Sequence, residues 1–291
     1  MFKIKSLLFV IFCTSTLSAQ ISGIVKDSLT KKPIPYVNIW VENENSGTTS
    51  NENGLFELNI NDEKRIVFSA LGFENKTIAS SKTKNVLLNP KIYELNEVIV
   101  ENLKRTKELE IGGAKKIHHS HLSGDKPWIY GKLFDYEEQY SETPYIKKVI
   151  FYSNSDIKNA KLKIRIFEMN DSIPSNDLLY EEIIITVKKG MKKNSIDVSQ
   201  NNIKFSKKGV VIGLEWLIID ENKYNYEYKE SKIKKSFVTY APSLVINYED
   251  LENSFRYSGG KWIRSKKYDS KQNKPWDNKV LTPAINLLLT N

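Results

Sequence analysis

The stretch that decides the fold begins at residue 21 and reads ISGIVKDSLTKKPIPYVNIWVENENSGTTSNENGLFELNI over residues 21–60. Within it, apolar side chains alternate with other residues over 36–41 and again over 55–60. A period of two places every second side chain on the same face of a strand. The pair Asn53-Gly54 tolerates the positive φ angles that a tight hairpin turn requires. This stretch therefore predicts short strands with one buried face, joined by tight turns.

The same pattern continues beyond residue 60. Short apolar runs follow at 65–69 and 86–88, and residues 95–100 read LNEVIV. Several short strands at regular spacing, separated by turn residues, are typical of a β-sandwich or barrel. We expect one self-contained β-domain over residues 20–100.

Several short motifs recur along this stretch in a fixed order: Gly23-Ile24-Val25 with Asp27, Pro33, Gly47-Thr48, Asn51, Gly54-Leu55-Phe56, Ser69 with Leu71-Gly72-Phe73, and Leu95 with Glu97-Val98-Ile99-Val100. In these motifs residues 21–100 resemble the carboxypeptidase-regulatory-like, transthyretin-like β-sandwich domain of exported Bacteroidetes proteins. The chain has Asn51 where that family often has Asp, and Phe73 where it often has Tyr. The resemblance implies an accessory module that accompanies peptidases and outer-membrane receptors and itself cleaves nothing.

Residues 1–19 have the three parts of a secretory signal peptide. Lys3 and Lys5 are followed by an apolar run over 7–12, and small residues precede a natural cleavage site after Ala19. That run is far shorter than the roughly 20 apolar residues of a membrane-spanning helix, and no later stretch approaches this length. We expect an exported protein without a transmembrane helix, located in the periplasm or associated with the outer membrane.

The chain contains a single cysteine, Cys13, which lies inside the predicted signal peptide. A lipoprotein anchor at this position would need a small residue before the cysteine, whereas Phe12 is bulky. Once the signal is cleaved the mature chain has no thiol. Disulfides, thiolate metal ligands and a cysteine nucleophile are then excluded.

The chain carries 44 basic and 35 acidic residues, a formal net charge of +9. Without the signal peptide this becomes about +7, and most basic residues are scattered lysines. Nucleic-acid-binding proteins concentrate arginine and lysine on one face among exposed aromatic residues. We therefore expect an outer-membrane or periplasmic protein, or a glycan, as the partner, and no nucleic acid.

The C-terminal part, residues 126–291, returns to short alternating runs after a charged interval at 101–125 that we expect to be a linker. This part predicts a second β-sandwich. It loosely resembles an exported jelly-roll sandwich. The segments that carry this second resemblance are 147–152, 162–168, 173–175, 178–179, 196–198 and 213–216.

The only concentration of histidines is His118-His119-Ser120-His121. On a strand, His119 and His121 project to the same side, and two neutral imidazoles can hold zinc or copper. A third ligand has to come from elsewhere in the chain. These two histidines are candidate metal ligands, and the alternative is an exposed polar strand or loop. No cofactor is expected.

Five aromatic residues are candidates for stacking on sugar rings: Trp128, Tyr130, Trp216, Trp262 and Trp276. Trp216 lies in a strongly apolar run and is expected in the core. Trp262 and Trp276 have lysine-rich neighbours and are the candidate ligand-binding residues.

The sequence contains no recognisable catalytic pattern. None of the three histidines is followed three residues later by the glutamate that a zinc carboxypeptidase needs. The doublets Glu137-Glu138 and Glu181-Glu182 project to opposite faces of a strand, so they make poor catalytic pairs. We predict a non-enzymatic cell-envelope protein that recognises a protein or polymer. The alternative is a carbohydrate-binding accessory protein of a nutrient-uptake system.

Overall fold

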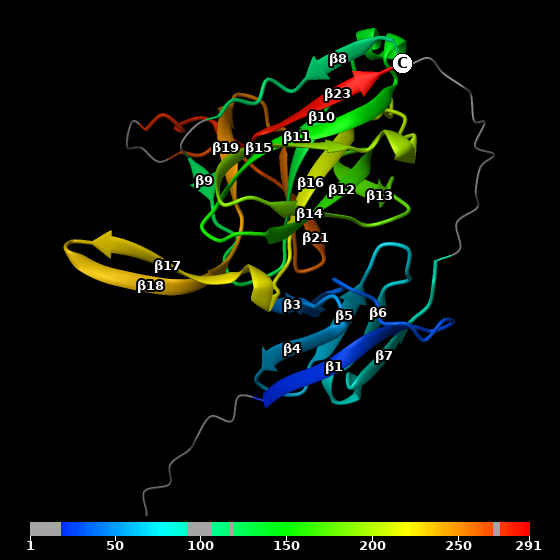
Figure 1. The fold of residues 1–291 in the computed structure, drawn as a ribbon, viewed down its shortest axis with the longest axis vertical. Coiled ribbons are helices and arrows are strands. Elements are labelled where there is room, and N and C mark those ends of the chain that lie inside the picture. Colours follow the sequence, from blue (N-terminus) through cyan, green and yellow to red (C-terminus); the bar gives the residue numbers. More distant parts are fainter. Residues whose placement is uncertain (1–18, 92–105, 117–118, 270–273) are drawn as a thin grey trace, which may run out of the picture.

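The computed structural model describes residues 19–91, 106–116, 119–269 and 274–291. Strands form nearly all of the regular structure, arranged as a small N-terminal region below a larger C-terminal region in Figure 1. The predicted signal peptide lies outside the described residues except for Ala19, the first residue of β1. No helix in the described ranges has the length and apolarity needed to cross a membrane. The predicted all-β class is confirmed. Within these ranges there are also four short 3-10 turns: η1 (Ser80–Lys82), η2 (Glu138–Glu142), η3 (Ser199–Asn201) and η4 (Asp220–Asn222).

The N-terminal region consists of two small sheets that face each other across one core. One sheet has the order β4-β1-β7, with β1 (Ala19–Asp27), β4 (Leu55–Ile60) and β7 (Asn85–Leu88). The other has the order β3-β2-β5-β6, with β2 (Asn38–Val41), β3 (Gly47–Thr49), β5 (Arg65–Ser69) and β6 (Lys76–Ala79). Buried and exposed residues alternate strictly along β4. The period-two pattern thus does place one face of β4 in the core, together with Val37 and Ile39.

The predicted turn at 51–54 has the expected conformation. Gly54 has a φ of 72°, and the Asn51 side-chain oxygen accepts hydrogen bonds from the backbone N–H groups of Asn53 (2.9 Å) and Leu55 (3.0 Å). Asparagine is favoured in turns because its side chain bonds to the backbone in this way. The local sequence therefore fixes the start of β4.

The C-terminal region has two larger sheets around a second core. The first has the path β13-β12-β16-β10-β20-β21, with β14 paired to β12. The second has the path β22-β19-β11-β23-β8, with β15 paired to β11 and β9 to β19. Apolar residues from both sheets share one cluster, for example Leu162, Ile164, Trp216, Phe151 and Leu287. The strands of the first sheet are β10 (Ile129–Phe134), β12 (Ala160–Asn170), β13 (Ile173–Asp177), β14 (Ile183–Val187), β16 (Val210–Trp216), β20 (Ser254–Ser258) and β21 (Lys261–Arg264). Those of the second are β8 (Glu108–Ile111), β9 (Ser120–His121), β11 (Tyr145–Ser155), β15 (Gly190–Asp197), β19 (Ser243–Glu249), β22 (Val280–Pro283) and β23 (Ile285–Thr290).

The interval 101–125, expected to be a linker, contributes two strands to this region. β8 pairs with β23 and β9 pairs with β19. Both strands are short and only half-buried, so neither carries an apolar run that would mark it in the sequence. The second sandwich therefore begins before residue 126.

The two regions pack directly against each other. Lys163 Nζ donates a hydrogen bond to the backbone oxygen of Tyr36 (2.9 Å), and Ile218 N–H donates to Thr49 Oγ1 (3.1 Å). Tyr36 also packs in an apolar cluster with Leu217 and Ile219. Because buried polar contacts need defined geometry, this interface holds the N-terminal region in one position on the larger one.

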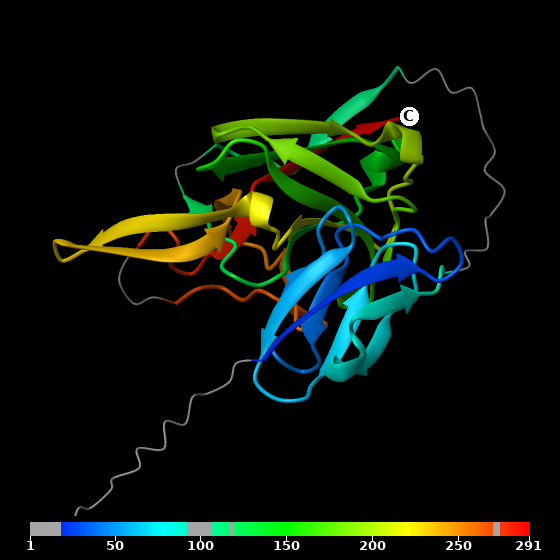
Figure 2. The same cartoon turned by 60° about the horizontal axis from the view of Figure 1, so that its bottom comes forward.

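A two-stranded hairpin projects from the body, as Figures 1 and 2 show. It consists of β17 (Lys223–Glu230) and β18 (Ile233–Tyr240), which form a sheet of their own. The turn residues Ser231 and Lys232 have φ angles of 47° and 76°. Two positive φ angles are typical of the tight hairpin turn whose twist matches that of its strands.

Candidate functional site

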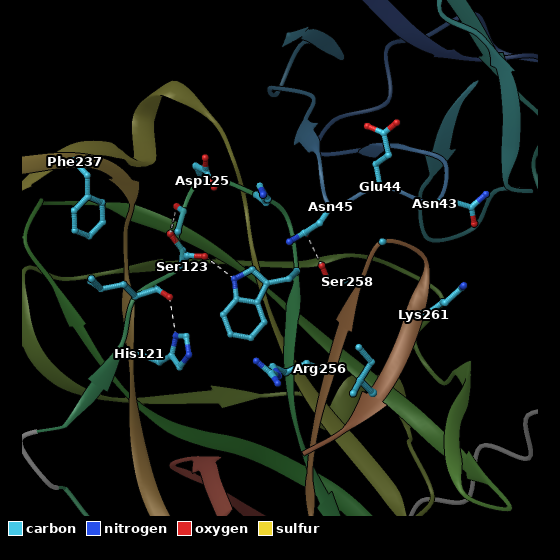
Figure 3. A pocket seen from close by; sticks show the side chains of 16 residues that line it. Asn43, Glu44, Asn45, His121, Ser123, Asp125, Phe237, Arg256, Ser258 and Lys261 are labelled. Atoms are coloured by element: carbon cyan, nitrogen blue, oxygen red, sulfur yellow. Dashed lines mark hydrogen bonds between the residues drawn. The ribbon is translucent and has the colours of Figure 1, made fainter. Parts of the chain in front are cut away.

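A cleft of ≈ 780 Å³ lies where the two regions meet the base of the hairpin. Residues 43–45, in the loop after β2, form one wall, and residues 121–126 form the other (Figure 3). β18 contributes Phe237, and the β20–β21 hairpin contributes Arg256 and Lys261. In Figure 3, Phe237 lies across the cleft from residues 43–45. The cleft therefore exists only because the two regions are docked.

Trp128 lines the cleft and connects it to the core. Its ring stacks on that of Trp216, with 4.3 Å between the ring centres, and Trp216 is fully buried. Its indole N–H donates a hydrogen bond to the Ser123 backbone oxygen (2.6 Å). A half-buried tryptophan fixed in this way offers a rigid apolar surface to a ligand.

His121 lies beside Trp128, with 5.1 Å between the ring centres. Its Nδ1–H donates to the backbone oxygen of Leu122 (2.8 Å), since a carbonyl can only accept. Burial lowers the pKa of His121 from 6.5, and nearby Arg256 lowers it further against the opposing effect of that hydrogen bond. The imidazole is therefore neutral at pH 7, with Nε2 left to accept a hydrogen bond.

Three cations line the cleft: Lys126, Arg256 and Lys261. Among the described residues none of them forms an ion pair. Of the two acidic residues in the lining, Glu44 already pairs with Lys64 (2.9 Å), which leaves Asp125. The cleft therefore carries a surplus of positive charge, which favours an acidic ligand.

Ser123, His121 and Asp125 all line the cleft, but they do not form a catalytic arrangement. The Ser123 hydroxyl donates to the Tyr240 backbone oxygen (2.6 Å) and accepts from the Tyr240 N–H (3.0 Å). The Nδ1–H of His121 is bonded to a backbone carbonyl rather than a carboxylate. A nucleophilic serine needs a base within hydrogen-bond reach, and that base needs an orienting group. These three side chains therefore do not form an acyl-transfer triad.

His119 and His121, the candidate metal ligands, have different surroundings. His119 Nδ1 is hydrogen-bonded to the Tyr248 hydroxyl, and its ring lies 5.4 Å from that of Trp276. The ring of His121 instead contacts Trp128 and Tyr130. Across the described ranges, no three histidine, cysteine or acidic side chains are grouped as metal ligands. A metal site at these histidines stays a prediction, and His118 lies outside the described residues.

Trp262 and Trp276, the candidate ligand-binding residues, lie apart from each other and outside the cleft lining. Trp262 borders a separate groove of ≈ 240 Å³ between the two regions, together with Arg165 and Asp177. Its ring also packs edge-on against Phe167 (5.0 Å between centres). Trp276 is half-buried against His119. Trp262 thus lies in a cavity with polar side chains.

The residues that the sequence analysis missed are Ser123, Arg256, Phe237 and the loop at 43–45. Arg256 is one of few arginines in a lysine-rich chain, which is a weak signal. The others carry no signal, because their proximity depends on how two separate sandwiches dock.

Comparison with known families assigns the N-terminal region. Residues 21–100 match the model of the CarboxypepD_reg-like domain, which confirms the resemblance noted in the sequence. No curated protein matches the chain. The C-terminal region, which supplies most of the cleft, has no family assignment.

Proposed function

We propose that this chain, whose residues 21–100 form a CarboxypepD_reg-like domain, is an exported, non-enzymatic cell-envelope protein that recognises a protein or polymer. Domains of this family are common in outer-membrane transport and adhesion proteins. The predicted signal peptide supports a place in the periplasm or at the outer membrane.

The interdomain cleft is the observation that carries this proposal. Its walls come from two regions held together by buried polar contacts, so the cavity is formed before any ligand arrives. It combines a rigid aromatic surface at Trp128 with cations that have no acidic partner in the described ranges. A preformed cavity with a few polar groups is typical of a binding site.

The test measures how strongly the mature protein and two of its variants bind a partner captured from an envelope fraction. Arg256→Ala removes a cleft cation, and Lys107→Ala removes an exposed lysine that pairs with Glu142 far from the cleft. We expect Arg256→Ala to weaken binding of the captured partner about tenfold, as for a central charged contact, and Lys107→Ala to leave it unchanged. Equal binding by wild type and both variants contradicts a function at the cleft.

The second candidate function is carbohydrate binding, and the position of Trp262 favours it. Aromatic rings beside polar side chains are a common arrangement for sugar recognition, and Trp262 borders a groove with Arg165 and Asp177. A glycan array distinguishes the two functions. Binding that is lost in Trp262→Ala or Trp276→Ala supports the carbohydrate function, whereas capture of an envelope protein without glycan binding supports the first.

A further inference from the structure

The projecting hairpin has an open backbone edge beside the cleft. β17 and β18 pair only with each other, so each has one edge without a neighbouring strand in the described structure. Long exposed edges without proline are rare, because they invite another strand to pair. This edge runs through the eight residues of β18.

The register shows which backbone groups face outward. Glu230 and Ile233 flank the two-residue turn, so they exchange both hydrogen bonds, and the next pair along the ladder does not. By this alternation the N–H and C=O groups of Lys234, Ser236 and Val238 point away from β17. In the described structure, none of these backbone groups has a hydrogen-bond partner.

The contact at Tyr240 confirms this alternation. Tyr240 is two residues beyond Val238, and its outward N–H and C=O are both hydrogen-bonded to the Ser123 hydroxyl (3.0 and 2.6 Å). Thr239 Oγ1 donates to the neighbouring Gly124 backbone oxygen (3.2 Å). The segment 123–124 therefore occupies the outward backbone groups of Tyr240. It leaves those of Val238, Ser236 and Lys234 open.

The face of the hairpin next to this edge is aromatic. Tyr226, Tyr228 and Phe237 lie on the same face, with ring centres 5.5 to 6.4 Å apart. Phe237 is 41% exposed and also lines the cleft. Side chains at alternate positions of an added strand would lie on this face.

The charge around the edge is positive. The hairpin carries Lys223, Lys229, Lys232, Lys234 and Lys235 against Glu227 and Glu230. Only Lys234 and Lys235 are paired to these two glutamates, at exposed positions. Beyond the hairpin base lie the unpaired cations of the cleft, including Arg256. Cations along an edge favour an acidic partner through electrostatic complementarity.

We propose that an extended, acidic segment of another protein adds to β18 as a third strand and continues into the cleft. This mode of recognition combines backbone hydrogen bonds with alternate side-chain contacts. The inference rests on the proposed function and names its partner class as an acidic peptide segment.

The experiment uses a random dodecapeptide library displayed on phage and selected on the mature protein. Enriched peptides are synthesised, and their affinities are measured for wild type and two proline variants. Ser236→Pro removes an outward N–H from β18, and Asn225→Pro removes one from β17, where the neutral Asn225 lies opposite Val238. Both substitutions leave the ladder between the strands intact, which makes each the control for the other.

We expect the enriched peptides to be rich in Asp and Glu, and Ser236→Pro to weaken their binding at least about tenfold. Asn225→Pro is expected to change it less than about twofold, since β17 is the remote edge. Bound peptide should also slow amide hydrogen exchange at Lys234 and Val238, which stacking on aromatic rings would not do. Circular dichroism confirms that both variants fold.

Four results overturn the proposal. These are the absence of any enriched peptide, equal binding by both proline variants, binding lost only in Phe237→Ala, and self-association that Ser236→Pro abolishes. The third result indicates side-chain stacking of the peptide on Phe237 without strand addition, and the fourth indicates that a second copy of the chain occupies the edge. If Arg256→Ala abolishes partner binding and Ser236→Pro does not, the strand-addition inference fails while the proposed function stands.

Discussion

Two sets of charged side chains lie where the sandwiches meet, and they differ in what surrounds them. The first set is buried: Glu215 and Lys163 are 0% and 1% exposed, and Arg165 lies beside them. The second set, Arg256 with Lys126 and Lys261, lines the open cleft without acidic partners in the described ranges. Charges taken out of water need partners, whereas solvated charges do not. The first set therefore fixes the domain interface, and the second is available to a ligand.

The buried set is a connected network. Arg165 Nη1 lies 2.9 Å from Glu215 Oε2, and Lys163 Nζ lies 2.7 Å from Glu182 Oε1. The Asn38 side chain, from the N-terminal domain, donates a hydrogen bond to Glu215. Burial by itself would raise the pKa of Glu215, but Lys163 and Arg165 outweigh it and hold the pKa below its usual 4.5. Glu215 is therefore ionised at neutral pH.

The largest expected effect comes from breaking this network. Glu215→Gln removes the fully buried counter-charge that Lys163 and Arg165 share and leaves them only the less buried Glu182 and Asp177, so we expect the free energy of unfolding to fall by about 3 kcal/mol. The measurement is urea denaturation. Glu142→Gln is the control, because Glu142 pairs with Lys107 at an exposed position and its loss should leave stability unchanged. An equal effect of the two substitutions would contradict the distinction between the two sets.

The same variant tests a predicted pH dependence of the stability. A carboxyl whose pKa is lowered by folding stabilises the protein above its unfolded pKa, and this contribution is lost as the pH falls through the folded value. The difference in stability between wild type and Glu215→Gln should therefore be largest above pH 4.5 and shrink below it. Denaturation curves from pH 7 to pH 3 measure this difference. A difference that grows on acidification would mean that Glu215 is protonated in the folded protein.

A smaller effect is expected at the base of the hairpin. Ser123→Ala removes both hydrogen bonds to Tyr240 from a site that is 5% exposed. We expect a loss of about 1–2 kcal/mol and faster amide exchange at Tyr240. Ser141→Ala, which removes an exposed hydrogen bond to Glu138, is the matched control. Unchanged exchange at Tyr240 would show that Ser123 does not anchor β18.

The smallest effect on stability is expected at the cleft cations. Arg256→Ala should change the free energy of unfolding by less than about 0.5 kcal/mol, because the residue is exposed. It should nevertheless raise the pKa of His121, since Arg256 lowers that pKa in the wild type. NMR titration of the imidazole measures the shift. Lys261→Ala should shift the pKa of His121 less. A large loss of stability in Arg256→Ala would place Arg256 in the first set, the charges that fix the domain interface.

The N-terminal sandwich could be predicted from its sequence because its signals are local. The alternation over 55–60 became a strand with alternating burial, and Asn51 and Gly54 became the expected turn. In the C-terminal region the same reasoning placed Trp216 in the core, where it is fully buried. Local patterns did not predict β8 and β9, because the strand character of these segments comes from pairing with distant strands.

The candidate site was less accessible to sequence reasoning. His121, a candidate metal ligand from the sequence, lies in the cleft lining beside Trp128, which the sequence did not indicate. Trp262 does border a cavity, but between the domains. Arg256, Ser123 and the loop at 43–45 gave no usable pattern, because residues more than 75 positions apart form one cleft only after docking.

The sequence by itself determined the all-β class, the family of residues 21–100 and the turns of that domain. These follow from period-two alternation and from the φ preferences of asparagine and glycine, which act over a few residues. Only the tertiary structure decided which charges are buried and which are free, and where the open edge of β18 lies. Those properties depend on desolvation and strand pairing between segments that are remote in the chain.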